Sequence, residues 1–482
     1  MNIASLSVNL AIPEIFIASM ACLILVAGLF GNQERSRLLC YRLSIATLLI
    51  TAILTIVGIT SESQLAFNGL FVDDPLAELL KFGICMLTAA VFFYGRQYNL
   101  DRNLFHSEYY VLGLLAVCGM LVMISANHLL ALYLGLELMS LCLYSMIAFY
   151  REDKLAVESA MKYFVLGALA SSILLYGISL LYGLTGSLHL PEIRDTIANM
   201  DHTNPALLLG VVLIVTGLGF KLGVVPFHMW VPDVYQGAPT STTAFIGTAP
   251  KIAAFALVFR LLSGGLQELH DVWYQMLIVL ALLSVLAGNV IAIAQDNLKR
   301  MLAYSTISHM GFFLFGVLAG NQAGYSAALF YVLVYSIMSC GAFGLILMLS
   351  RKGFESELLD DLKGLDQKSP WIALLFLVLM LSMAGIPPMA GFFAKLAVIR
   401  SLVEQDLVWV AVFAVLLAVV GAYYYLRIIK LVYFDPPSAP GSVTVKPMNW
   451  IVIVVNIGIL IIMLPWIGAL IELCKHVIRG IG

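Results

Sequence analysis

Residues 213–240 read LIVTGLGFKLGVVPFHMWVPDVYQGAPT, an apolar run that Pro226 interrupts near its middle. A similar run at 380–400, MLSMAGIPPMAGFFAKLAVIR, is interrupted by Pro387 and Pro388. Proline removes a backbone donor and clashes with the preceding helical turn. At membrane depth, a broken backbone is tolerated only where protein or a water-filled cavity surrounds it. Both runs therefore predict discontinuous helices enclosed in a membrane bundle.

The composition of the whole chain agrees with this interpretation. Of 482 residues, 61% are hydrophobic and 11% are charged, whereas a soluble chain is about 45–50% apolar and about 25% charged. A net charge of −2 gives no bulk basicity that would attract nucleic acid. The seven cysteines form no CxxC pair, and no Gly-rich phosphate loop is present. We therefore expect no metal, redox cofactor or nucleotide site in this chain.

About fourteen apolar runs are long enough to span a bilayer, which takes about 20 residues. They lie near 12–30, 40–60, 75–94, 108–125, 127–150, 155–183, 206–226, 241–262, 272–294, 297–319, 323–350, 370–403, 406–434 and 449–472. If the N-terminus is outside, 16 of the 26 Lys and Arg residues fall in inward loops and five on the outward side. The positive-inside rule then predicts an all-α polytopic protein with both termini outside.

The two broken spans are the seventh and the twelfth, five helices apart. A repeat unit with an odd number of helices must insert upside down relative to its copy, so helices 4–8 and 9–13 are predicted to form two inverted five-helix repeats. Two unrelated proline kinks remain the alternative. The predicted segments are 1–107 (three helices), 108–262 (first repeat), 272–434 (second repeat) and 449–482 (C-terminal helix).

Five ionisable residues fall at or near the middle of predicted spans. They are Glu137 in the fifth, Lys221 before the first break, Lys251 in the eighth, His309 in the tenth and Lys395 after the second break. A charge at the bilayer centre costs roughly 2.5–3.5 kcal/mol on insertion scales. Such residues persist by pairing, by facing water or by staying neutral, so they are candidates for function.

A proton relay is the chemistry that suits these residues. Burial favours the neutral form of an amine, and a nearby carboxylate favours its charged form. Moving Glu137 relative to Lys221 would therefore switch Lys221 between holding and releasing a proton, and Lys251, His309 and Lys395 would be further stops. The alternatives are a structural ion pair for Glu137 and Lys221, and a hydrogen-bonded core residue for His309.

Two further lysines lie inside predicted spans. Lys162 is about two turns inside the sixth span, where it is either part of the relay or a side chain that reaches the surface. Lys81 follows Glu78 at a spacing of three residues, which predicts a structural pair within one helix. The role of Lys81 and Glu78 stays open at this point.

Four segments carry a family resemblance. GFKLGVVPFHMWVPDVYQGAPT, DNLKRMLAYSTISHMG, GIPPMAGFFAKL and GAYYYLRIIKLVY resemble the signature segments of the chain N family of bacterial NADH:quinone oxidoreductase, respiratory complex I. The resemblance covers nearly the whole chain and implies fourteen helices in two inverted repeats.

The resemblance also implies roles for individual residues. Glu137 and Lys221 would form the pair of the first half-channel, Lys251 the central relay and Lys395 the lysine of the exit half-channel. His309 matches the tenth-helix histidine of the family, and Lys162 matches a further lysine of its pattern. Related chain M has Glu where Lys395 stands, which favours chain N.

The resemblance implies a proton-translocating subunit in a bacterial inner membrane, with both termini periplasmic. NADH, FMN, iron–sulfur clusters and quinone would belong to partner subunits, and the partners would be other membrane subunits, including neighbouring antiporter-like chains. Two alternatives are kept. A cation/proton antiporter subunit would need no redox partner, and a non-pumping structural or quinone-binding subunit would tolerate neutral replacement of Glu137 and Lys221.

Overall fold

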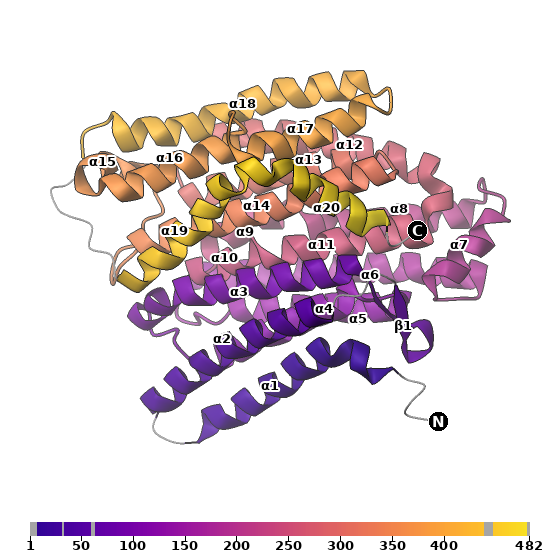
Figure 1. Ribbon diagram of the computed structural model, residues 1–482, viewed down its shortest axis with the longest axis horizontal. Helices are drawn as coiled ribbons and strands as arrows, with labels where there is room; N and C mark the ends of the chain where they lie inside the picture. The colour runs from indigo at the N-terminus through magenta and orange to yellow at the C-terminus, as the bar shows by residue number, and fades with distance from the viewer. Residues whose placement is uncertain (1–6, 31–32, 59–62, 438–446, 480–482) are drawn as a thin grey trace.

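The computed structural model describes residues 7–30, 33–58, 63–437 and 447–479. The outermost residues of the first and last predicted segments, 1–6 and 480–482, lie outside the described residues. The helices run side by side along the long axis of a single bundle (Figure 1). In chain order they are α1 (Ile12–Leu29), α2 (Gln33–Val57), α3 (Pro75–Asp101), α4 (Ser107–Ile124), α5 (Leu129–Ile147), α6 (Lys154–Thr185), α7 (Leu190–Ala198), α8 (Pro205–Leu222), α9 (Trp230–Gly237), α10 (Thr240–Ile246), α11 (Ala249–Phe259), α12 (His270–Ile293), α13 (Leu298–Val317), α14 (Gln322–Leu349), α15 (Leu365–Lys368), α16 (Pro370–Ala384), α17 (Ala390–Val403), α18 (Val408–Tyr433), α19 (Pro447–Ile462) and α20 (Ile467–Arg479).

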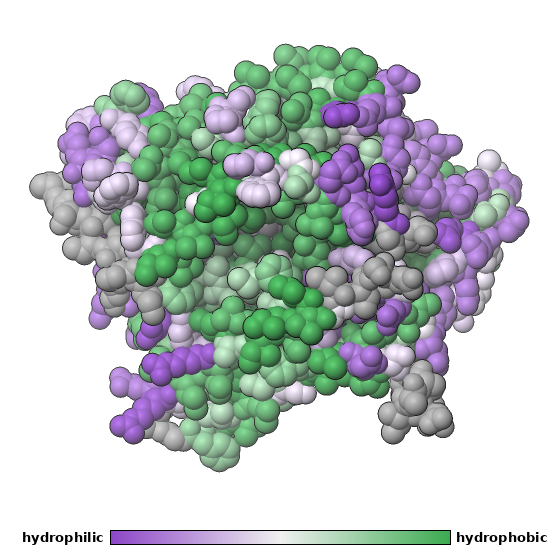
Figure 2. All heavy atoms as spheres, in the orientation of Figure 1, coloured by the Kyte–Doolittle hydropathy of each residue, from purple (hydrophilic) through white to green (hydrophobic). Residues whose placement is uncertain are grey.

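Eleven helices of the described chain are long and apolar enough to cross a membrane, and the bent pair that includes α19 and α20 brings the number to 12. Figure 2 shows apolar side chains over the middle of the bundle and hydrophilic ones gathered at its left and right ends, as a bilayer requires. The remaining two predicted spans, the tenth and the twelfth, correspond to α13 and to the pair α16 and α17. Both segments are helical. Helix α13 is too polar to count as a span by its apolar character, and the second segment is divided by the break between α16 and α17.

The polarity of α13 has a simple explanation in its burial. Nearly every residue of this helix is enclosed by protein, including Lys299 and His309. A helix that does not face lipid need not be apolar on its outer surface. The span Thr240–Gly265, which joins α10, α11 and the π-helical segment η4 (Arg260–Gly265), is likewise buried along its whole apolar core.

Glycine residues allow close contact between the helices of two pairs, α4 with α5 and α12 with α13. A Cβ at Gly119 of α4 would lie 2.6 Å from the carbonyl oxygen of Gly135 in α5, and one at Gly135 would lie 2.7 Å from that of Gly119. The pair α12 and α13 meets in a similar way, since a Cβ at Gly288 would lie 2.8 Å from the carbonyl oxygen of Tyr304. The absent side chains let the two backbones approach closely.

A short hairpin is the part of the fold that the sequence did not predict. Strands β1 (Gln64–Ala66) and β2 (Phe71–Asp73) pair antiparallel, with Ala66 opposite Phe71. Together with the short 3₁₀ helix η2 (Val8–Ala11), they form a small apolar cluster of Ala11, Ala66 and Phe71 at one end of the bundle. Strands of three residues are too short to give a period-two pattern that can be recognised.

The charge-dense loop 351–369 is partly tied into the bundle. Glu355 accepts hydrogen bonds from Tyr98 at 3.1 Å and from Thr240, and it pairs with Arg102. The loop therefore joins the end of α3 to the start of α10. The beginning of α1 and the end of α20 both lie at the opposite end of the bundle from α15 (Figure 1).

Candidate functional site

The first helix break lies between α8 and α9. Helix α8 ends at Leu222, and Gly223 adopts a φ of 77°, which glycine tolerates without strain. The Gly223 N–H donates to the carbonyls of Gly219 and Phe220, so the last turn closes before the chain turns away at Pro226. Pro232 lies in the first turn of α9 and Pro239 directly before α10, so neither interrupts a helix.

The second break, between α16 and α17, has the same construction. Helix α16 ends at Ala384, and Gly385 adopts a φ of 79°. Its N–H donates to the carbonyls of Leu381 and Ser382, and Pro387 and Pro388 follow. The sequence therefore located both breaks correctly at Pro226 and at Pro387–Pro388.

Glu137 and Lys221 approach one another between α5 and α8. The Lys221 Nζ lies 3.8 Å from the Glu137 Oε1 and donates a hydrogen bond of 3.0 Å to the Ser140 hydroxyl. Ser171 of α6 donates a short hydrogen bond to the same Glu137 oxygen. The Lys221 side chain is 6% exposed and that of Glu137 is 22% exposed. The carboxylate thus lies at the rim of the bundle and the lysine inside it.

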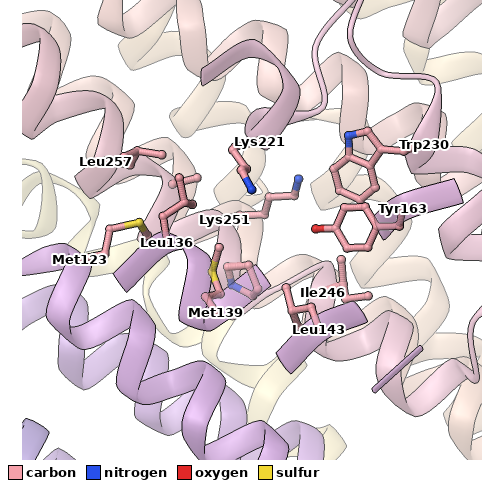
Figure 3. Close-up of a pocket in the computed structure, with 12 residues that line it drawn as sticks. Met123, Leu136, Met139, Leu143, Tyr163, Lys221, Trp230, Ile246, Lys251 and Leu257 are labelled. Carbon is pink, nitrogen blue, oxygen red and sulfur yellow. The ribbon is translucent and has the colours of Figure 1, made fainter. Parts of the chain in front are cut away.

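Lys251 of α11 stands beside this pair. Its Nζ donates at 3.1 Å to the carbonyl of Leu222, the residue at which α8 ends, and lies 5.7 Å from the centre of the Trp230 ring. Lys221 and Lys251 line one cavity of about 20 Å³, and Figure 3 shows their ammonium groups directed into the same space beside Trp230 and Tyr163. A volume of roughly 10–15 Å³ suffices for one water molecule, so a single water fits in this cavity.

Lys395 occupies the corresponding place at the second break. Its Nζ donates to the carbonyl of Ala384 at 2.8 Å and to that of Met383 at 3.3 Å. Both lysines therefore hold carbonyl oxygens that a broken helix leaves without intrahelical donors. Within the described residues, Lys251 and Lys395 form no ion pair, and the negative end of a helix dipole takes the place of a carboxylate.

His309 of α13 lies between two tyrosine hydroxyls. Its Nδ1 is 2.7 Å from the Tyr331 hydroxyl and its Nε2 is 3.1 Å from the Tyr425 hydroxyl. His309, Lys395 and Tyr425 line a second cavity of about 10 Å³. Because an imidazole can accept a proton on one nitrogen and release one from the other, this arrangement can pass a proton between hydroxyl groups.

Lys162 contacts neither the residues around Lys221 and Lys251 nor those around His309 and Lys395. Its side chain is 45% exposed on α6, and its Nζ pairs with Glu158 at 2.8 Å and with Asp233 of α9 at 3.0 Å. Asp233 also pairs with Arg300 of α13 at 2.9 Å. The structure therefore brings together Glu137, Lys221 and Lys251 in one place and His309 and Lys395 in another, and places Lys162 on an outer face.

Sequence reasoning missed the polar neighbours of these residues. Ser140 lies three residues after Glu137, which is helical spacing, and it could have been found from that alone. Tyr331 and Tyr425 come from α14 and α18, and nothing in their local sequence indicates contact with His309. No group of three or more His, Cys, Asp or Glu side chains in the described ranges is arranged to hold a metal ion.

The comparisons with known proteins identify the family. A family model described as NADH:quinone oxidoreductase/Mrp antiporter, TM, matches residues 126–421, more than half of the chain. NADH-quinone oxidoreductase subunit N of Thioalkalivibrio sulfidiphilus is 54% identical over 94% of each chain. The chain belongs to the subunit N family of NADH-quinone oxidoreductase. The subunit N of Thiobacillus denitrificans is 56% identical over 89% of this chain and 90% of the relative.

Solved structures agree with membership of the subunit N family. A chain of respiratory complex I from Thermus thermophilus with bound aureothin is 30% identical, with a TM-score of 0.82 over 95% of this chain and 98% of that chain. A chain of the Mrp complex from Dietzia sp. has a TM-score of 0.84 over 98% and 97% at 21% identity, which shows a shared fold alone. This chain is therefore a multi-pass, antiporter-like membrane subunit of an NADH-quinone oxidoreductase complex.

Proposed function

We propose that this chain translocates protons through two enclosed groups, Glu137–Lys221–Lys251 and His309–Lys395, driven by quinone reduction in other subunits. The observation that carries the proposal is the cavity that Lys221 and Lys251 share beside Glu137. Two lysine side chains face one water-sized space beside a single carboxylate, so a proton can pass from the charged amine of one lysine to the neutral amine of the other without a change of fold.

The direction of transfer in the first group follows from charge. When Glu137 is close, its carboxylate stabilises the charged form of Lys221. When Glu137 moves away or is neutralised, Lys221 releases its proton through the cavity toward Lys251, which the Leu222 carbonyl orients. In the second group the ring nitrogens of His309 and the Tyr425 hydroxyl pass the proton toward Lys395.

We include Lys162 in the proposal as a charge on the outer face that acts on the first group through α9. It pairs with Asp233 of α9, and the same helix begins at Trp230, whose ring lies against Lys251. A change of charge at Lys162 would therefore act on Lys251 through α9.

We propose that residues 108–262 and 272–434 are inverted repeats, flanked by 1–107 and 449–482. The matching construction of the two breaks and of the glycine contacts at Gly119 and Gly288 supports this division. We further propose a bacterial inner membrane with both termini periplasmic, no redox centre in this chain, and NADH, FMN, iron–sulfur clusters and quinone held by partner subunits. Neighbouring antiporter-like chains are the proposed lateral partners.

Lys221→Ala tests the relay in native membranes, with NADH oxidation and the proton gradient followed in the same vesicles. Lys430→Ala is the matched control, because Lys430 also lies near a helix end but is exposed and pairs with Asp435 at 3.3 Å. The proposal expects both activities to fall together in an assembled Lys221→Ala complex and to stay normal in the control. Normal turnover and pumping in the Lys221→Ala complex would leave a non-pumping structural role instead.

A further inference from the structure

A second group of buried ionisable side chains lies outside both relay groups, at the end of the bundle where α1 begins. Glu14 comes from α1, Asp73 from β2, and Glu78 and Lys81 from the start of α3. Their exposed fractions are 6%, 3%, 4% and 0%. The helix pairing predicted between Glu78 and Lys81 is therefore only one part of a larger cluster, which we call the α1–α3 cluster.

Three carboxyl groups surround one ammonium in the α1–α3 cluster. The Lys81 Nζ lies 2.9 Å from the Glu14 Oε1, 3.8 Å from the Asp73 Oδ1 and 3.9 Å from the Glu78 Oε1. The Phe71 ring covers the ammonium at 5.0 Å. Phe71 also belongs to the apolar hairpin cluster described above, so an apolar cover separates Lys81 from the end of the bundle.

Neighbouring groups do not balance the excess negative charge. Arg260 of η4 lies nearby, but its guanidinium pairs with Asp74 at 2.7 Å and donates to the Ile124 carbonyl at 3.0 Å. The titratable groups that face the cluster from α3 and α4 are the thiols of Cys85 and Cys118. With all three carboxyls ionised, the cluster would carry three negative charges and one positive charge.

The positions of Asp73 and Glu78 show where a proton belongs. Both carboxyl groups face the Lys81 ammonium from farther away than Glu14 does, with the Asp73 Oδ1 at 3.8 Å and the Glu78 Oε1 at 3.9 Å from the Nζ. The Glu78 Oε2 and the Asp73 Oδ1 are enclosed, and no donor group of the described protein reaches them. Three enclosed carboxyls around a single ammonium do not all ionise at low dielectric, so the two that lie farther from the ammonium retain a proton. Glu14, the carboxylate closest to Lys81, is then its ion-pair partner.

We propose that the α1–α3 cluster is a proton-binding site, in which Asp73 and Glu78 share one proton and Glu14 pairs as a carboxylate with Lys81. The ligand is a proton rather than a metal ion, because an ammonium already occupies the centre and the described residues offer no three-ligand metal site. The site lies on α1, β2 and α3 and includes none of the relay residues, so the proposal can be tested independently of Glu137 and Lys221.

Infrared difference spectra of the purified whole complex test the proposal. Glu78→Gln keeps the shape of the side chain and removes the shared proton, so the spectrum of the wild type minus the variant should contain the C=O stretch of a protonated carboxyl, shifted in heavy water. Asp73→Asn should remove the same band, which keeps the test available if one variant fails to assemble. Asp74→Asn is the control, because its carboxylate faces Arg260 and should contribute carboxylate bands only.

Two results would overturn the assignment. If Glu78→Gln and Asp73→Asn change only carboxylate bands, the cluster is fully ionised and structural. If sodium at constant pH abolishes the protonated band in the wild type, the cluster is a cation site. Loss of the band in both carboxyl variants, with Asp74→Asn unaffected and sodium without effect, supports the proton-binding site.

Discussion

Glu137→Gln removes the negative charge of the group Glu137–Lys221–Lys251 and keeps the size of the side chain. Glutamine keeps the length of the side chain and an oxygen for the Ser171 hydroxyl, but removes the negative charge 3.8 Å from the Lys221 Nζ. Coulomb's law gives about 4 kcal/mol for this attraction at an effective dielectric of about 20 and about 1 kcal/mol at that of water. Because the Glu137 side chain is 22% exposed, the loss should fall between these limits.

At about 1.4 kcal/mol per factor of ten, the charged form of Lys221 loses between roughly fivefold and about 700-fold in population relative to the neutral form. NADH oxidation and the proton gradient, measured in the same membrane vesicles, should therefore fall together. Ser171→Ala is the control, because it removes one hydrogen bond to Glu137 and keeps the carboxylate. An assembled Glu137→Gln complex with wild-type turnover and gradient would refute the electrostatic coupling.

Three further predictions concern assembly and stability. Asp74→Ala removes a buried ion pair, worth about 3–5 kcal/mol when one partner is lost, and a helix N-cap, worth about 1 kcal/mol, so thermal denaturation should show a loss of about 4–6 kcal/mol. Gly391→Ala places a Cβ against the Ser382 carbonyl oxygen at the second break and should reduce complex yield on native gels, whereas Gly183→Ala, with nothing within 4 Å, should not. Burial and then His189 lower the pKa of His128, so its contribution to stability is complete above the ordinary histidine pKa and is lost as pH falls through the lowered value; denaturation at acidic pH should be weaker in a His189→Gln variant.

The spans could be predicted because each is a long apolar run, and the breaks because proline has one effect on a helix wherever it occurs. The close approach of Glu137 and Lys221 was also predictable, since two opposite charges in lipid need one another. The hairpin and the enclosure of α13 were not predictable. The first is too short to carry a pattern, and the second depends on neighbours rather than on the helix itself.

The partners of Lys251 and Lys395 could not be predicted for a different reason. Both bind backbone carbonyls, and a carbonyl is present at every residue, so the sequence does not distinguish the free ones from the others. The predicted pair of Lys81 and Glu78 is present at 3.9 Å, but the closest carboxylate is that of Glu14 on another helix, which spacing along one helix could not indicate. Lys162 is near the relay in sequence order but faces outward.

The enclosure of the span Thr240–Gly265 also limits which amino-acid substitutions this span can accept. Most residues of α1 and α18 are not fully buried within this chain, so many of them can exchange among Leu, Val, Ile and Phe with little consequence for its packing. Every residue in the apolar core of Thr240–Gly265 has fixed neighbours, so a change of one methylene creates a void or a clash. When a library of random substitutions is selected for respiratory growth, the surviving variants should therefore carry changes at the rim of the bundle and few changes along Thr240–Gly265.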